Sequence, residues 1–217
     1  MLTLMKTYNY ILLDWDGTLV NSLELWLSAL KTALLGHGYS FADDVIGANY
    51  SIFRRKASLL GVENVDNIIR YAEGMFAGDT IQPTLYTGAL DFIKNVHSSK
   101  QIAIVTTSTH SQVDTLLNKF GLSGYIDAVV CSDDVKKQKP DAEPLKMALN
   151  IIGGNMDESV MLGDSGIDII AARSAGIDSI LIHPDSHNKF YDVAALKELK
   201  PTHLVKTYYE AQKLILA

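Results

Sequence analysis

The sequence predicts an α/β protein in which helices flank a parallel β-sheet and a block of helices is inserted after the first strand. Short apolar runs recur along the 217 residues, and a helical pattern follows most of them. One long helical stretch, over residues 22–84, interrupts this alternation. Alternating strands and helices favour a parallel sheet with helices on both faces.

The expected strands are short, rich in β-branched residues and continuously apolar, as strands buried on both faces are. In chain order they are residues 10–13, 102–105, 128–131, 160–162, 180–182 and, more weakly, 204–205. Apolar residues three or four apart indicate amphipathic helices between them. These helices cover residues 90–96, 113–120, 145–151 and 167–175.

The inserted block begins with an apolar stripe over residues 23–34 that ends at Gly36 and Gly38, both of which are typical of helix ends. Residues 52–60 and 68–76 also have helical spacing, and the block contains no convincing strand. We therefore predict two domains. They are an α/β core of residues 1–21 and 85–217 and a helical domain of residues 22–84.

Composition excludes several classes of protein. Acidic residues number 25 and basic residues 19, and a net charge of −6 is unlike that of proteins that bind nucleic acid or anionic membranes. The single cysteine, Cys131, excludes an internal disulfide framework and is interpreted as a small core residue. No apolar stretch approaches the ~18 residues of a membrane span, and the start does not resemble a signal peptide. We expect a cytoplasmic protein that binds neither nucleic acid nor membranes.

Acidic residues follow two of the expected strands. Asp14 and Asp16 come directly after the first strand, and Asp164 and Asp168 come after the fourth. An acidic turn or a helix start would explain either pair alone. If the two strands are neighbours, however, the carboxylates converge, and two charges ~4 Å apart repel by about 4 kcal/mol at an effective dielectric near 20. Such a cluster must hold protons or a cation, and oxygen ligands favour Mg²⁺.

Groups suited to an anion follow two further strands. Thr106 and Thr107 offer hydroxyl and backbone N–H donors, and Lys139 offers an ammonium group that can neutralise a phosphoryl oxygen. A helix cap explains the threonines equally well, and a solvated basic run explains the lysine. Only the joint arrangement of these groups with the acids indicates an anionic substrate.

In chain order these residues resemble the motifs of the haloacid-dehalogenase superfamily of phosphotransferases. The matching motifs are Asp14-x-Asp16-Gly17-Thr18, Thr106, Lys139-Pro140 and Gly163-Asp164-x₃-Asp168. The resemblance implies a Rossmann-like core. The helical insert, and Tyr86-Thr87-Gly88 where the chain re-enters the core, are similar to the small helical cap of the phosphoglycolate phosphatase and β-phosphoglucomutase branch.

The resemblance also implies residue roles. Asp14 would be the nucleophile that becomes an aspartyl phosphate, and Asp16 would protonate the leaving oxygen and then activate water. Mg²⁺ would be held by Asp14, the main-chain carbonyl of Asp16 and Asp164, with Asp168 supporting Asp164 or reaching the metal through water. The phosphoryl group would be bound by Thr106, Thr107 and Lys139.

In the insert, Arg54 and Arg55 are candidates to pair with a carboxylate or second phosphate of the substrate. Exposed helix charges are the simpler interpretation of both.

The expected function is that of a Mg²⁺-dependent phosphatase that hydrolyses a small phosphomonoester resembling phosphoglycolate, a sugar phosphate or a nucleotide. Two alternatives stay open. A β-phosphoglucomutase-like enzyme would pass the phosphoryl group to a sugar hydroxyl, and a non-enzymatic phospho-acceptor would keep it. The expected partner is a small phosphorylated metabolite, bound by a monomer or homodimer.

Overall fold

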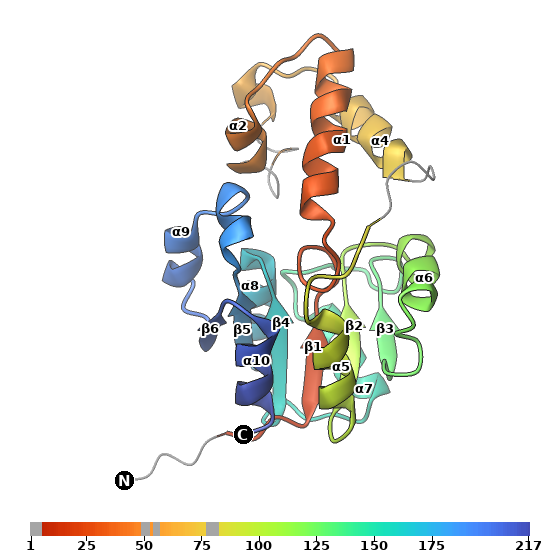
Figure 1. Ribbon diagram of the computed structural model, residues 1–217, viewed down its shortest axis with the longest axis vertical. Coiled ribbons are helices and arrows are strands. Elements are labelled where there is room, and N and C mark those ends of the chain that lie inside the picture. Colours follow the sequence, from red (N-terminus) through yellow and green to blue (C-terminus); the bar gives the residue numbers. More distant parts are fainter. Residues whose placement is uncertain (1–5, 49–52, 54–56, 77–82) are drawn as a thin grey trace. The chain divides into compact units, whose positions relative to one another are not determined.

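The computed structural model describes residues 6–48, 53, 57–76 and 83–217 (Figure 1). The chain forms two compact units. The α/β unit contains the described residues up to Val20, with Leu85–Asp185 and Val193–Ala217. The helical unit contains the described residues of Asn21–Thr84 together with Ser186–Asp192.

The described part of the α/β unit contains a six-stranded parallel sheet in the order β3-β2-β1-β4-β5-β6. The strands are β1 (Tyr10–Leu13), β2 (Gln101–Val105), β3 (Ala128–Val130), β4 (Ser159–Gly163), β5 (Asp178–Ile182) and β6 (His203–Val205). Each coincides with an apolar run of the sequence, so the predicted parallel sheet is confirmed. Cys131, which the pattern placed in the third strand, lies one residue beyond β3.

Helices cover both faces of this sheet, as predicted. The first hydrophobic core includes residues of α5 (Ala89–His97), α6 (His110–Lys119) and α10 (Tyr208–Ile215), and the second includes residues of α7 (Glu143–Ile151) and α8 (Gly166–Ala175). Ile11 and Leu13 of β1 pack in the first core and Leu12 packs in the second, because successive side chains of a strand point to opposite faces. A further helix, α9 (Val193–Glu198), precedes β6.

The helical unit has a core of its own. Its described elements are α1 (Leu23–Gly36), α2 (Asp43–Ala48), the 3₁₀-helix η2 (Ala57–Leu60) and α4 (Val65–Phe76). Leu30 and Leu34 of α1 are buried in this core with Ile68 of α4, as the stripe of apolar residues predicts.

Phe190 also belongs to the core of the helical unit and is 3% exposed. It follows a second 3₁₀-helix, η3 (Asp185–Lys189). The segment Ser186–Asp192 therefore belongs to the helical unit, whereas the sequence reasoning placed it in the α/β core. No local pattern shows where a single buried aromatic residue packs.

None of the described helices combines the length and the apolar character that crossing a membrane requires.

Candidate active site

Three buried carboxylates meet at one edge of the sheet in the α/β unit. Carboxylate oxygens of Asp14, Asp164 and Asp168 lie within 4.8 Å of one another. They come together because β1 pairs with β4, with Leu13 beside Leu162, so that both strands end at the same level. The backbone N–H of Asp14 continues this ladder by donating to the Leu162 carbonyl at 2.9 Å.

Lys139 supplies a positive charge inside this cluster. It reaches the sheet edge from the segment between β3 and α7, and its side chain is 1% exposed. The ammonium Nζ donates to Asp14 Oδ1 at 2.5 Å and to Asp168 Oδ1 at 2.7 Å. A buried charge requires such partners, and this double contact links two carboxylates that would otherwise repel each other.

Asp168 is held at both of its oxygens. Oδ1 accepts from Lys139, and Oδ2 accepts from the backbone N–H of Ser165 at 3.2 Å and from its hydroxyl at 2.6 Å. Ser165 is the N-cap of α8 and Asp168 the third helical residue, which makes this a capping box. A side chain at Gly163 would place its Cβ 2.4 Å from Cγ of Asp168. Glycine at this position therefore allows the Asp168 carboxylate to lie against the end of β4.

The turn after β1 is shaped to fit against Asp164. Gly17 has a φ of +77°, and a Cβ there would lie 2.2 Å from Asp164 Oδ2. The Thr18 hydroxyl is 3.2 Å from Asp14 Oδ2 and 3.3 Å from Asp164 Oδ1, so it can donate to either carboxylate. The Tyr208 hydroxyl donates to the backbone carbonyl of Thr18. Sequence reasoning missed Tyr208, because nothing local connects it to a turn 190 residues away.

Asp16 has a partner that the sequence did not single out. The Ser108 hydroxyl donates to Asp16 Oδ2 at 2.6 Å. The backbone N–H of Ser108 donates to Thr106 Oγ1 at 3.0 Å, and Thr106 is itself buried. Thr107 is exposed. The run of hydroxyl residues after β2 was the only signal for Ser108, and it could not tell which hydroxyl faces Asp16.

The charges in the cluster influence one another. Burial raises the pKa of Asp14 to about 7, against the attraction of Lys139, and the negative charges of Asp168 and Asp16 act in the same direction as burial. Burial acts to lower the pKa of Lys139, but Asp14 and Asp168 outweigh it and raise that pKa. The lysine is therefore charged at neutral pH, while Asp14 titrates there. A divalent cation beside Asp14 would favour its ionised form.

The donor set suits a hard divalent cation. Asp14 and Asp164 offer carboxylate oxygens within 4.8 Å of each other, and both side chains are at least nine-tenths buried. Because Lys139 and Ser165 already engage both oxygens of Asp168, this carboxylate is better placed to position its neighbours than to bind a metal directly. A Cβ at Gly17 would overlap Asp164 Oδ2, so glycine at this position lets the Asp164 carboxylate keep its place in the cluster.

Arg54 and Arg55 lie outside the described residues, so the structure says nothing of their contacts.

Comparison with known proteins identifies relatives. The family model described as haloacid dehalogenase-like hydrolase matches residues 11–182. Pyrophosphatase PpaX of Halalkalibacterium halodurans is 31% identical over 180 residues, which cover 80% of this chain and 83% of the relative. A plasmid-encoded phosphoglycolate phosphatase of Cupriavidus necator is 38% identical over 82 residues, which cover 38% of this chain and 36% of the relative.

Solved structures show the same fold. A haloacid dehalogenase-like family hydrolase from Streptococcus pneumoniae superposes with a TM-score of 0.79 at 20% identity, over 95% of this chain and 97% of the other. A hydrolase of the same superfamily from Ehrlichia chaffeensis has a TM-score of 0.67 at 22% identity and covers 98% of both chains.

Proposed function

This chain belongs to the haloacid dehalogenase-like hydrolase family, and we propose that it is a Mg²⁺-dependent phosphatase that acts on a small phosphomonoester. The observation that carries the proposal is the arrangement around Asp14. Its carboxylate follows β1, one of the two central strands, accepts a hydrogen bond from Lys139 at 2.5 Å and lies beside Asp164 and Asp168. Phosphoryl transfer needs such positioning and charge neutralisation more than it needs covalent chemistry from the protein.

In the first step, a carboxylate oxygen of Asp14 forms a bond to phosphorus as the bond from phosphorus to the leaving oxygen breaks. Asp16 donates a proton to that oxygen, and the product is an aspartyl phosphate. In the second step Asp16, now ionised, takes a proton from water, whose oxygen displaces Asp14 from phosphorus. A carboxylate nucleophile thus divides one difficult displacement into two easier steps.

The remaining residues hold these groups in place. Lys139 fixes the orientation of the Asp14 carboxylate and, with Thr106 and Thr107, binds the phosphoryl group in the proposal. Ser108 holds the Asp16 carboxylate through its hydrogen bond of 2.6 Å. A proton donor must lie within hydrogen-bond reach of the leaving oxygen, so a fixed Asp16 carboxylate supports its role as acid and base.

Mg²⁺ would be held by Asp14, Asp164 and the main-chain carbonyl of Asp16, with Asp168 in support. When bound, it supplies charge neutralisation for the phosphoryl oxygens. The all-oxygen donor set supports this choice of metal.

The helical insert of residues 22–84 is proposed as a cap domain on a core of residues 1–21 and 85–217. It would select the substrate, and Arg54 and Arg55 are candidates to pair with a second anionic group of that substrate. The name of the pyrophosphatase relative adds inorganic pyrophosphate to the candidate substrates.

The proposal is tested by measuring phosphate release with Mg²⁺ from phosphoglycolate, sugar phosphates, mononucleotides and pyrophosphate. We expect turnover of at least one of these without any bisphosphate activator. Isomerised sugar phosphate in place of free phosphate would favour the mutase instead. A stable aspartyl phosphate that forms without turnover would favour the phospho-acceptor.

A further inference from the structure

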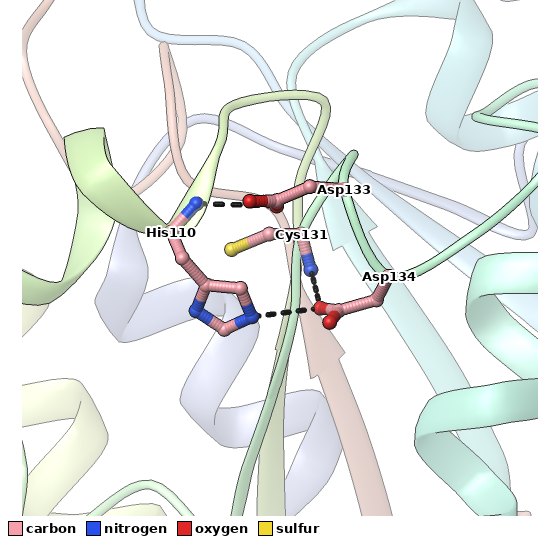
Figure 2. Close-up of side chains that lie close together, drawn as sticks. All are labelled: His110, Cys131, Asp133 and Asp134. Atoms are coloured by element: carbon pink, nitrogen blue, oxygen red, sulfur yellow. Dashed lines mark hydrogen bonds and ion pairs between the residues drawn. The ribbon is translucent and has the colours of Figure 1, made fainter.

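A second group of metal-ligating side chains lies in the α/β unit, formed by His110, Cys131, Asp133 and Asp134 (Figure 2). His110 is the first residue of α6, and the other three follow β3. One ligand atom from each residue lies within 4.8 Å of those of the others. The proposed phosphatase mechanism uses none of these four residues.

The donor atoms are those that zinc prefers. Cysteine sulfur, imidazole nitrogen and carboxylate oxygen are the usual ligands of Zn²⁺ in tetrahedral sites. With metal–ligand bonds of ~2.0–2.3 Å, the ligand atoms of such a site lie about 3.3–3.8 Å apart. Because no pair of ligand atoms in the cluster is more than 4.8 Å apart, each pair would have to close by at most about 1–1.5 Å. Side-chain rotation can supply a movement of this size.

Cys131 distinguishes this cluster from an ordinary acidic turn. Its side chain is fully buried, and within the described chain its thiol makes no hydrogen bond. Figure 2 shows the sulfur between the imidazole of His110 and the carboxylate of Asp133. A buried thiol that faces three other ligand groups is therefore available to a metal.

His110 already has the environment of a metal-binding histidine. Its Nε2 lies 2.8 Å from Asp134 Oδ2, and its Nδ1 lies 3.3 Å from Asp114 Oδ1. Zinc-bound histidines usually donate their second ring N–H to a carboxylate, which fixes the orientation of the ring. A metal between Nε2 and Asp134 would leave Nδ1–H to donate to Asp114.

The local charge favours a cation. Three carboxylates, those of Asp114, Asp133 and Asp134, surround one imidazole. Like charges this close repel one another, so a divalent cation bound between them would offset that repulsion.

We propose that His110, Cys131, Asp133 and Asp134 bind a Zn²⁺ ion, separately from the carboxylate site at Asp14. The bonds formed are those from zinc to sulfur, nitrogen and oxygen. The thiol proton of Cys131 passes to solvent, and the imidazole binds in its neutral form with its remaining proton on the nitrogen that faces Asp114.

Occupancy of this site would affect the loop that holds Asp16. The backbone N–H of Ser132 donates to the Ser108 carbonyl at 2.9 Å, and the Ser108 hydroxyl holds Asp16. Zinc would fasten the start of α6 to the turn after β3, and these two segments flank that loop. The ion would therefore reduce the mobility of Asp16, which the proposed phosphatase mechanism uses as acid and base.

Cobalt titration of the reduced full-length protein tests the proposal, because Co²⁺ bound to a thiolate gives a charge-transfer band that oxygen ligands do not give. We expect one equivalent of Co²⁺ to produce this band with release of the Cys131 thiol proton. One equivalent of Zn²⁺ should then displace the Co²⁺ and abolish the band. Wild-type protein that binds Co²⁺ without the band would overturn the proposal.

Variants locate the ligands. Cys131→Ala should lose the band. His110→Gln and Asp134→Asn should each weaken Co²⁺ binding by about 10-fold or more. Asn at position 134 keeps an acceptor for the Cys131 backbone N–H, so that variant tests ligation with the turn intact.

Two control variants test whether the band belongs to these four residues. His97→Gln changes a histidine whose Nδ1 also lies near a carboxylate, Asp127 Oδ2 at 3.9 Å, and should leave the band unchanged. Asp164→Asn should also leave it unchanged, because that residue belongs to the proposed Mg²⁺ site. Unaltered Co²⁺ affinity in His110→Gln, or loss of the band in Asp164→Asn, would contradict a separate zinc site.

Discussion

At the scale of single residues, Asp14 has an environment that is unusual for a carboxylate. It is buried, yet it accepts a hydrogen bond from a charged lysine and lies among other carboxylates. Burial and neighbouring charges of this kind are how active sites adjust the reactivity of a side chain. The surrounding groups thus hold one carboxylate in a fixed position, as a nucleophile requires.

Asp14→Asn should reduce turnover by at least about 1,000-fold, because the amide cannot form the aspartyl phosphate. The fold should survive, since Asp168 still accepts a hydrogen bond from Lys139. Steady-state phosphate release measures the loss, and circular dichroism checks the fold. Near-normal turnover in a folded variant would remove the covalent mechanism.

Ser108→Ala should lower kcat by roughly 10-fold with little change in KM, because Ser108 positions Asp16 but does not bind substrate in the proposal. The matched control is Ser111→Ala, which removes an exposed hydroxyl three residues along the same segment. A rise in KM at constant kcat would assign Ser108 to substrate binding instead.

At the scale of elements, the turn after β1 packs tightly against the carboxylate cluster. A left-handed backbone at Gly17 and the nearby Asp164 carboxylate both require glycine. These two requirements can be separated by experiment, because the chain contains a glycine that meets only the first. Gly121 has a φ of +67°, and a Cβ added to it would have no atom within 4 Å.

Gly121→Ala should lower the unfolding free energy by about 1 kcal/mol, because its only cost is that of holding alanine in a left-handed backbone conformation. Gly17→Ala should cost more and should also abolish activity, because its Cβ displaces Asp164. Denaturant unfolding and phosphate release measure the two effects. Equal destabilisation with activity retained in both variants would show that the contact with Asp164 is unimportant.

At the scale of the whole molecule, ion pairs join segments that are distant in the sequence. Asp178, at the start of β5, accepts hydrogen bonds from Lys6 at 2.7 Å and from the Tyr8 hydroxyl at 2.8 Å. Burial acts to raise the pKa of Asp178, but these donors outweigh it and lower the pKa below its ordinary value of 3.8. The contact therefore fastens the segment before β1 to another strand.

A carboxyl group with a lowered pKa stabilises the fold above its unfolded pKa, and that stability is lost as the pH falls through the folded pKa. Asp178→Asn should therefore destabilise the protein by about 1 kcal/mol at neutral pH and by progressively less as the pH falls below 3.8 and through the lowered pKa of Asp178. Unfolding free energies at several pH values measure this difference. The exposed Asp157→Asn is the control, and a difference that grows on acidification would contradict the assignment.

Metal binding should stabilise the whole fold, because an ion held by carboxylates that follow β1 and β4 joins two segments of the chain. Mg²⁺ at 100 times its Kd should add about 2.7 kcal/mol to the unfolding free energy. EDTA should reverse the gain, and Asp164→Asn should show none. An equal gain in Asp164→Asn would place the ion elsewhere.

Local patterns were sufficient to predict the strands, most of the helices and the two groups of aspartates. Apolar runs and helical spacing reflect burial of each segment, and burial leaves a periodic trace in the sequence. The acidic motifs could also be recognised locally, because Asp14 and Asp164 each come immediately after a strand. The resemblance to a known superfamily then supplied roles that spacing alone did not.

Only the tertiary structure decided which of these groups meet. Asp14 and Asp164 lie together because β1 pairs with β4 and both residues follow the carboxyl-terminal ends of these strands. Lys139 contacts both Asp14 and Asp168 from the segment between β3 and α7. The contacts of Ser108, Tyr208 and Phe190 follow from the same long-range packing. Such contacts join residues far apart in the chain, and a pattern that extends over a few residues carries no information about them.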